Sequence, residues 1–106
     1  MMGPTRIAPE QVRSCLKSVI DPEMGINIVD LGLIYGIHVG ENRIEVDMTL
    51  TNPQGPTGAV LASEVEQAVR MAFEAIDDVE VSLVWDPPWT FERLSEAAKQ
   101  ELGYEG

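Results

Sequence analysis

The sequence predicts a two-layer, single-domain α+β fold in which a helix, a β-hairpin, a helix, a strand and a helix follow one another. Apolar residues recur at helical spacing in the helical segments and alternate with other residues in the strands. A chain of 106 residues is long enough to bury one hydrophobic core and too short for two ordinary domains. We therefore expect one domain over residues 1–106, with its core between about residues 9 and 103.

The first half predicts a helix followed by a hairpin. Proline suits a first helical turn, so a helix begins near Pro9, and Pro22 ends it by disfavouring the helical conformation at Asp21. Residues 33–39 and 44–50 alternate as strands do, and the segment 40–42 supplies the turn between them. The two strands should pair antiparallel.

The second half predicts a helix over residues 61–76, a strand over 79–85 and a last helix. Thr90 is the expected N-cap of that last helix and Gly103 its stop. A strand–helix–strand unit favours parallel pairing of the second and third strands, which gives a three-stranded mixed sheet. One sheet face should carry the helices, and the less covered face is where a homodimer would form.

The same periodicity predicts the core. Trp85 continues the inward alternation of the third strand and is expected inside, whereas His38 alternates outward. Truncation of a buried core side chain to alanine should cost roughly 2–5 kcal/mol. The expected core side chains are Leu16, Ile37, Val46, Met48, Leu61, Val65, Phe73, Val81 and Leu83.

Charge and composition exclude several classes of function. The formal net charge of −11 opposes binding to nucleic acid or to an anionic membrane surface. No apolar run is long enough to span a membrane, and the N-terminal residues lack the apolar region of a secretory signal. The single cysteine, Cys15, fits a reducing compartment and lies on the apolar stripe of the first helix, where a small buried side chain is expected. We expect a cytoplasmic protein.

The first irregular segment, residues 21–32, carries Asp21, Glu23 and Asp30. Their carboxylates can bind a cation or a basic partner. Alternatively, Asp21 and Asn27 organise turns through bonds from side chain to backbone, which their spacing favours.

The second irregular segment, residues 51–58, contains Thr51, Gly55 and Thr57 before a helix. Its backbone N–H groups can form an anion site, or the segment is an ordinary strand–helix turn. It lacks the lysine of a phosphate-binding loop, which excludes nucleotide binding of that kind.

The third segment places Asp86, Trp89 and Thr90 around a Pro-Pro corner. Aromatic side chains beside such a corner suit a recognition surface, although Trp89 fits a core position equally well. No catalytic motif, zinc-ligand spacing or Cys-His pair is present, so we expect neither an enzyme nor a metal held by this chain alone.

Together these segments resemble the metal–sulfur cluster biosynthesis family, which has SufT-like and PaaD-like branches. The segments that carry the resemblance are DPEMGINIVDLGLIY (21–35), MTLT (48–51) with Pro53, and VWDPPWT (84–90). The resemblance covers roughly residues 9–103. It implies the fold described above and a role in assembling or maturing iron–sulfur clusters on target proteins.

One departure from the family pattern concerns a thiol. The resemblance implies a loop cysteine where this sequence has Gly55, before Pro56. Glycine cannot hold iron, so a cluster is expected only jointly with a partner.

The leading hypothesis is therefore an adaptor that binds iron–sulfur assembly or client proteins through the surface formed by the three motifs. On this hypothesis Trp89→Ala abolishes partner capture and leaves unfolding nearly unchanged. The alternatives are a PaaD-like, non-catalytic assembly subunit of a phenylacetyl-coenzyme A oxygenase and a carboxylate-based metal carrier.

Overall fold

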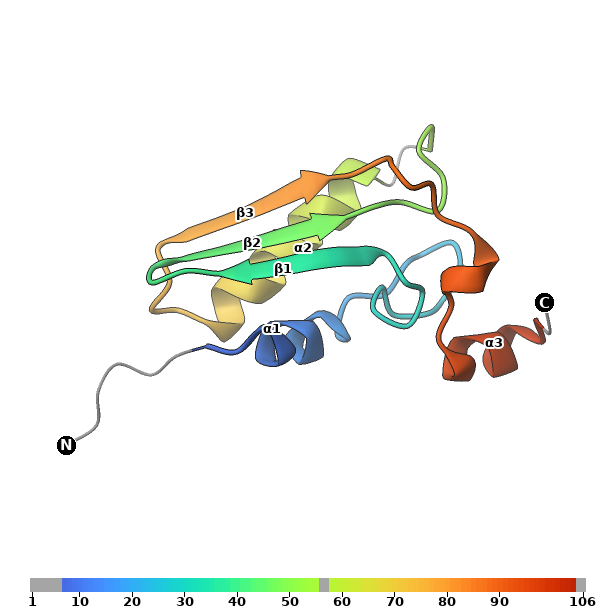
Figure 1. Ribbon diagram of the computed structural model, residues 1–106, viewed down its shortest axis with the longest axis horizontal. Helices are drawn as coiled ribbons and strands as arrows, with labels where there is room; N and C mark the ends of the chain where they lie inside the picture. The colour runs from blue at the N-terminus through green and yellow to red at the C-terminus, as the bar shows by residue number, and fades with distance from the viewer. Residues whose placement is uncertain (1–6, 56–57, 105–106) are drawn as a thin grey trace.

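The computed structural model describes residues 7–55 and 58–104. The helices and strands follow the predicted order, which confirms the α+β fold class (Figure 1). One short 3-10 helix, η1, was not predicted. The elements are α1 (Pro9–Leu16), β1 (Ile34–Val39), β2 (Arg43–Met48), α2 (Gly58–Ala72), β3 (Asp78–Leu83), η1 (Phe91–Arg93) and α3 (Glu96–Leu102).

The sheet has the predicted mixed topology, in the order β1-β2-β3. Val46 at the centre of β2 pairs with Ile37 across the antiparallel β1–β2 ladder and with Val81 across the parallel β2–β3 ladder. The register shifts between Ile34 and Gly36, where β1 carries an irregularity. The hairpin turn closes through the N–H of Gly40, which donates to the carbonyl O of Arg43 at 2.8 Å.

The core lies between the sheet and the two longer helices. Alternate residues of β2, namely Ile44, Val46 and Met48, are fully buried, as strand periodicity requires when one face is covered. Helix α2 supplies a stripe of buried apolar side chains at helical spacing. The connection between α1 and β1 adds further fully buried residues, of which Leu31 is one.

Five of the predicted core residues are buried, which confirms that part of the prediction: Leu16, Val46, Met48, Leu61 and Val65. Ile37, Phe73 and Val81 are only half-buried. The prediction was wrong for Leu83 and Trp85, whose side chains are 39% and 48% exposed.

Exposure along β3 explains these two errors. It rises from the buried Val79 through Val81 to Leu83, so the strand leaves the helical layer toward its C-terminal end. Alternation fixes the face on which a side chain lies, but it does not say whether another element covers that part of the face.

Two helix boundaries also differ from the prediction. Helix α1 ends at Leu16, and Ile20 instead forms an isolated antiparallel bridge with Asn27. The predicted last helix is divided, because Leu94 is extended (φ −61°, ψ 143°) between η1 and α3. Ser95, rather than Thr90, caps α3 by accepting the N–H of Ala98 at 3.1 Å, whereas Gly103 ends the helix at φ 73° as predicted.

The sheet face opposite the helices is polar. His38 lies exposed on it, as predicted, and its Nε2 is 3.0 Å from Oδ2 of Asp47. Among the described residues, no helix is long and apolar enough to cross a membrane.

Candidate functional site

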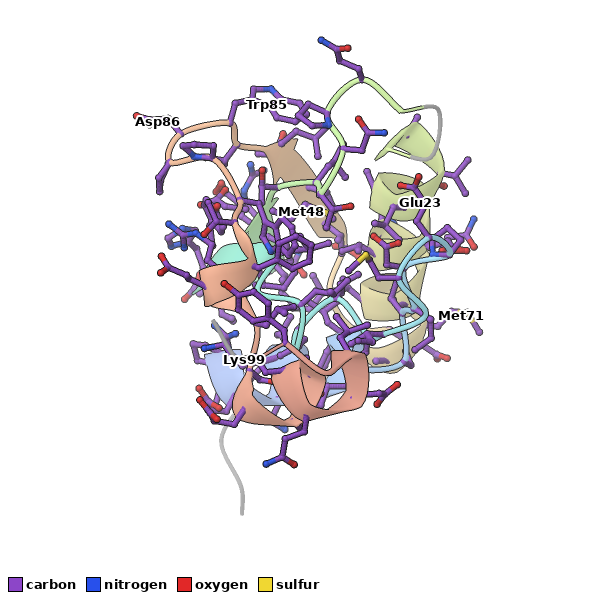
Figure 2. The ribbon with its side chains drawn as sticks, turned by 90° about the vertical axis from the view of Figure 1, so that its right-hand side faces the viewer. Glu23, Met48, Met71, Trp85, Asp86 and Lys99 are labelled. Atoms are coloured by element: carbon purple, nitrogen blue, oxygen red, sulfur yellow. The ribbon has the colours of Figure 1, made fainter. Side chains whose placement is uncertain are left out.

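The three sequence motifs meet at one end of the sheet. The first motif leads into β1, and the second and third follow β2 and β3. Since β1 runs antiparallel to β2 while β3 runs parallel to it, the start of β1 and the ends of β2 and β3 share one edge of the sheet. Figure 1 shows all three connections at the right-hand end of the molecule, and Figure 2 views that end directly, with Glu23, Trp85 and Asp86 labelled. We call this end the motif surface.

Asp21 organises the first turn of the motif surface. Its side chain is only 3% exposed, and its Oδ1 accepts the N–H groups of Glu23 at 2.7 Å and Met24 at 3.1 Å. The turn closes where the N–H of Gly25, at φ 71°, donates to the carbonyl O of Asp21. A short carboxylate that holds its own backbone in this way is an ordinary Asx turn. The turn-forming interpretation of Asp21 is therefore confirmed.

Asn27 and Asp30 form a second local network. The Oδ1 of Asn27 accepts the N–H groups of Val29 at 3.0 Å and Asp30 at 2.9 Å, and its Nδ2 donates to Oδ2 of Asp30 at 2.8 Å. The backbone carbonyl of Asp30 accepts the N–H of Ser95. Within residues 7–55 and 58–104, no group of three or more His, Cys, Asp or Glu side chains lies close enough to hold a metal ion. Of the three predicted carboxylates, that of Asp21 bonds backbone N–H groups, that of Asp30 bonds the side chain of Asn27, and only Glu23 is exposed.

The loop of the second motif is built around Asn52. Its Oδ1 accepts the N–H of Gln54 at 3.2 Å, and its carbonyl accepts the N–H of Gly55 at 3.1 Å. A Cβ at Gly55 would lie 3.0 Å from Nδ2 of Asn52, so a side chain there requires the asparagine to move. Thr51 is half-buried, and Thr57 lies outside the described residues. Helix α2 then begins at Gly58, where a Cβ would come within 2.5 Å of Cδ1 of Leu50.

The third motif is fastened to the first by side-chain contacts. The indole Nε1 of Trp89 donates to the carbonyl O of Leu31 at 2.6 Å, and the hydroxyl of Tyr35 donates to the carbonyl O of Pro87 at 2.8 Å. The guanidinium of Arg93 lies over the Tyr35 ring, 4.6 Å from its centre, in a cation–π geometry.

The structure places Trp85 on the surface, against its prediction as a core residue, and it favours the packed alternative for Trp89. Trp89 is half-buried and anchored, whereas Trp85 is 48% exposed at the motif surface (Figure 2). Asp86 and Thr90 are exposed as well. Sequence reasoning missed Trp85 as a surface residue, and the signal available was its place at the last position of the predicted strand, next to the Asp-Pro-Pro corner.

An apolar groove of about 170 Å³ adjoins the first turn and was not predicted. It lies between the α1–β1 connection and the N-terminal half of α2. Ile20 and Val60 are 48% and 59% exposed beside it. No sequence signal marked Ile20, because the helical pattern was expected to continue through it. The groove is lined by Ile20, Pro22, Val60, Leu61 and Glu64.

Cys15 lies away from the motif surface, between α1 and α2. Its Sγ donates to the carbonyl O of Ala68 at 3.4 Å, and burial raises the pKa of the thiol. A raised pKa keeps the thiol protonated and poorly reactive. Cys15 thus has the environment of a packing residue.

Comparison with known proteins supports the resemblance. The family model "Iron-sulfur cluster assembly protein" matches residues 9–83. The "Fe-S protein maturation auxiliary factor SufT" of Staphylococcus aureus (strain USA300) is 45% identical over 86 residues, covering 80% of this chain and 97% of that protein. The "Fe-S protein maturation auxiliary factor YitW" of Bacillus subtilis (strain 168) is 39% identical over 95 residues, covering 89% and 92%.

The fold has a close counterpart among solved structures. The crystal structure of a "Domain of Unknown Function DUF59" from Bacillus anthracis superposes with a TM-score of 0.86 at 36% identity. The match covers 90% of this chain and 91% of that one. Because the family model spans most of the sequence and the relatives share this degree of identity along nearly their whole length, the chain belongs to the iron–sulfur cluster assembly protein family.

Proposed function

We propose that this chain is an accessory factor in the maturation of iron–sulfur proteins, without enzymatic activity of its own. Two relatives are named as auxiliary factors of such maturation. The observation that carries the proposal is the meeting of all three motifs at one end of the sheet, beside an exposed tryptophan and an apolar groove.

The motif surface suits protein binding. Exposed aromatic side chains supply much of the energy of protein interfaces, and Trp85 is available for that role. The groove beside Ile20 and Val60 offers a second apolar contact. Glu23 and Asp86 are exposed acidic groups at the same end, so a partner with basic residues around an apolar patch would be complementary.

On this proposal the cluster is cargo that stays with a partner protein. Iron–sulfur clusters are held mainly by cysteine thiolates. The chain has one cysteine, Cys15, whose thiol is half-buried, hydrogen-bonded to Ala68 and protonated by virtue of its raised pKa. This donor set does not fit a cluster bound by the chain alone, so on this proposal the partner supplies the thiolate ligands.

Capture from cells tests the proposal. The tagged chain and its Trp85→Ala variant are recovered without oxygen from the cells of origin, and bound proteins are identified by mass spectrometry. We expect scaffold, carrier or client iron–sulfur proteins with the parent chain and their loss with Trp85→Ala. Met71→Ala is the matched control, because Met71 is 77% exposed near the C-terminal end of α2, and α2 begins at the motif surface and runs away from it (Figure 1).

Two outcomes would contradict the proposal. Recovery of oxygenase subunits alone would identify the chain as an assembly subunit of an oxygenase. Stoichiometric iron on the purified chain, lost when Asp21, Glu23 and Asp30 are replaced by their amides, would identify a carboxylate-based carrier. No contact among the described residues favours either alternative over the adaptor.

A further inference from the structure

Strand β3 is an edge strand, and its free side can be assigned from its hydrogen bonds. The N–H of Asp78 donates to the carbonyl O of Asn42 at 3.2 Å. The N–H of Val84 donates to the carbonyl O of Met48 at 2.8 Å. Even-numbered residues of this strand therefore face β2. Because backbone groups alternate along a strand, the N–H and C=O groups of Val79, Val81 and Leu83 point away from the sheet.

The beginning of this free edge is already occupied. Arg70 of α2 donates from Nη1 to the carbonyl O of Asp77 at 3.3 Å and from Nη2 to that of Val79 at 3.4 Å. In the described part of the chain, no such contact reaches the outward groups of Val81 and Leu83. An edge of this kind is a template for another strand.

The charge on the sheet face beside this edge indicates which kind of strand could pair with it. On the polar sheet face, Arg43 binds the carboxylates of Glu45, Asp78 and Glu80. Asp47 adds a fourth carboxylate on the same face, beside His38. One guanidinium among four carboxylates leaves this face with a net negative charge. Along β3, the side chains of Glu80 and Ser82 lie on this face.

The opposite face beside the same edge is apolar. Val81 is half-buried and Leu83 is 39% exposed there. A strand added at this edge would place alternate side chains next to Glu80 and Ser82 on one face, and next to Val81 and Leu83 on the other. Matching chemistry requires lysine or arginine on the first set and apolar side chains on the second.

We propose that the Val81–Leu83 half of the β3 edge accepts an extended segment of a partner protein, with alternating basic and apolar residues, as a fourth strand. A second copy of this chain fits less well, because each copy carries a formal charge of −11 and would bring its own acidic face to the contact. This edge is distinct from the groove on the helical side. The proposed function leaves the partner's chemistry at this edge open, and the edge specifies it as an extended segment with alternating basic and apolar residues.

A synthetic peptide in which lysine and valine alternate tests the proposal on the wild-type chain. Titration is followed by NMR, with amide hydrogen exchange read at Val81 and Leu83. We expect both amides to become protected, and a peptide alternating glutamate and valine to leave them unchanged. Glu80→Gln should weaken binding about twofold to fivefold, because it removes one cross-strand charge pair.

Backbone N-methylation of the peptide supplies the decisive comparison without altering the protein. Methylation of one alternate set of amides should weaken binding about tenfold, and methylation of the other set should leave it unchanged, since only one set faces β3. Equal effects of both sets, binding without protection at Val81 and Leu83, or no binding would each overturn the proposal. Protection of these amides in the absence of peptide, together with a dimeric mass, would show that a second copy occupies the edge.

Discussion

The indole of Trp89 donates a 2.6 Å hydrogen bond to the backbone carbonyl of Leu31, a residue 58 positions earlier in the chain. The Trp89 ring also meets that of Phe91 edge-on, with 5.1 Å between ring centres. These contacts make Trp89 the anchor of the third motif, which favours packing over recognition, the two roles that the sequence left open.

The anchor predicts a loss of stability on truncation. Trp89→Ala should lower the free energy of unfolding by about 2–3 kcal/mol, because it removes a half-buried ring and leaves the Leu31 carbonyl without its donor. Trp89→Phe should recover most of the ring packing and lose about 1 kcal/mol. Urea denaturation measures both. An unchanged urea midpoint for Trp89→Ala would contradict the anchoring role and favour a recognition role for Trp89.

The two left-handed glycines of the first motif form a matched pair. Gly25 and Gly32 have φ values of 71° and 80°, so alanine carries the same backbone penalty of about 1–2 kcal/mol at each. A Cβ at Gly25 meets nothing within 4 Å, whereas a Cβ at Gly32 would collide with the carbonyl O of Arg93. Gly32→Ala should therefore destabilise the chain clearly more than Gly25→Ala in urea denaturation. Equal losses would show that the close approach of η1 to Gly32 contributes nothing.

Core truncation should separate two positions that look alike in sequence. Leu61 is 2% exposed, and Leu61→Ala should cost about 2–5 kcal/mol of unfolding free energy. Phe73 is only half-buried beyond the end of α2, so Phe73→Ala should cost less than Leu61→Ala. Met71→Ala, at a position 77% exposed, is the control and should lie within about 0.5 kcal/mol of the parent. The reverse order for Leu61 and Phe73 would contradict this placement of the core.

The thiol of Cys15 should react slowly and show a defined pH dependence. Burial raises its pKa above the usual 9.0, so iodoacetamide should alkylate it more slowly in the native chain than in the guanidinium-unfolded chain at the same pH. Because the native state retains a proton that the unfolded state releases, this group favours folding fully below pH 9.0 and loses that effect as pH rises through the native pKa. The stability difference between the parent and Cys15→Ala should therefore shift against the parent above pH 9.0. Equal alkylation rates in the two states would contradict this.

The sequence predicted the sheet well because its signals are local. The strict alternation of Ile44, Val46 and Met48 fixed the buried face of β2, and the strand–helix–strand order favoured the parallel pairing with β3. The division of the last helix was not predictable, because a long-range tie from Ser95 to Asp30 fixes the chain where Leu94 is extended. Local propensity carries no information about such a contact.

The candidate site was predicted in part for the same reason. The side chains of Asp21 and Asn27 accept hydrogen bonds from backbone N–H groups two or three residues later, so the local sequence was enough to predict these turns. The groove requires Ile20 to meet α2, and the anchored position of Trp89 depends on Leu31, far away in the sequence. These features arise only when distant segments pack together.

The tie between Trp89 and Leu31 also closes a long loop of the chain. The indole and the carbonyl that it reaches are 58 residues apart, and the hydroxyl of Tyr35 and the carbonyl of Pro87 are 52 residues apart. Each contact therefore encloses β2, α2 and β3. Closing a loop of this length costs conformational entropy in an unfolded chain, so these two contacts should form once the sheet has already brought the first and third motifs together. The motif surface is thus assembled by the sheet that carries it.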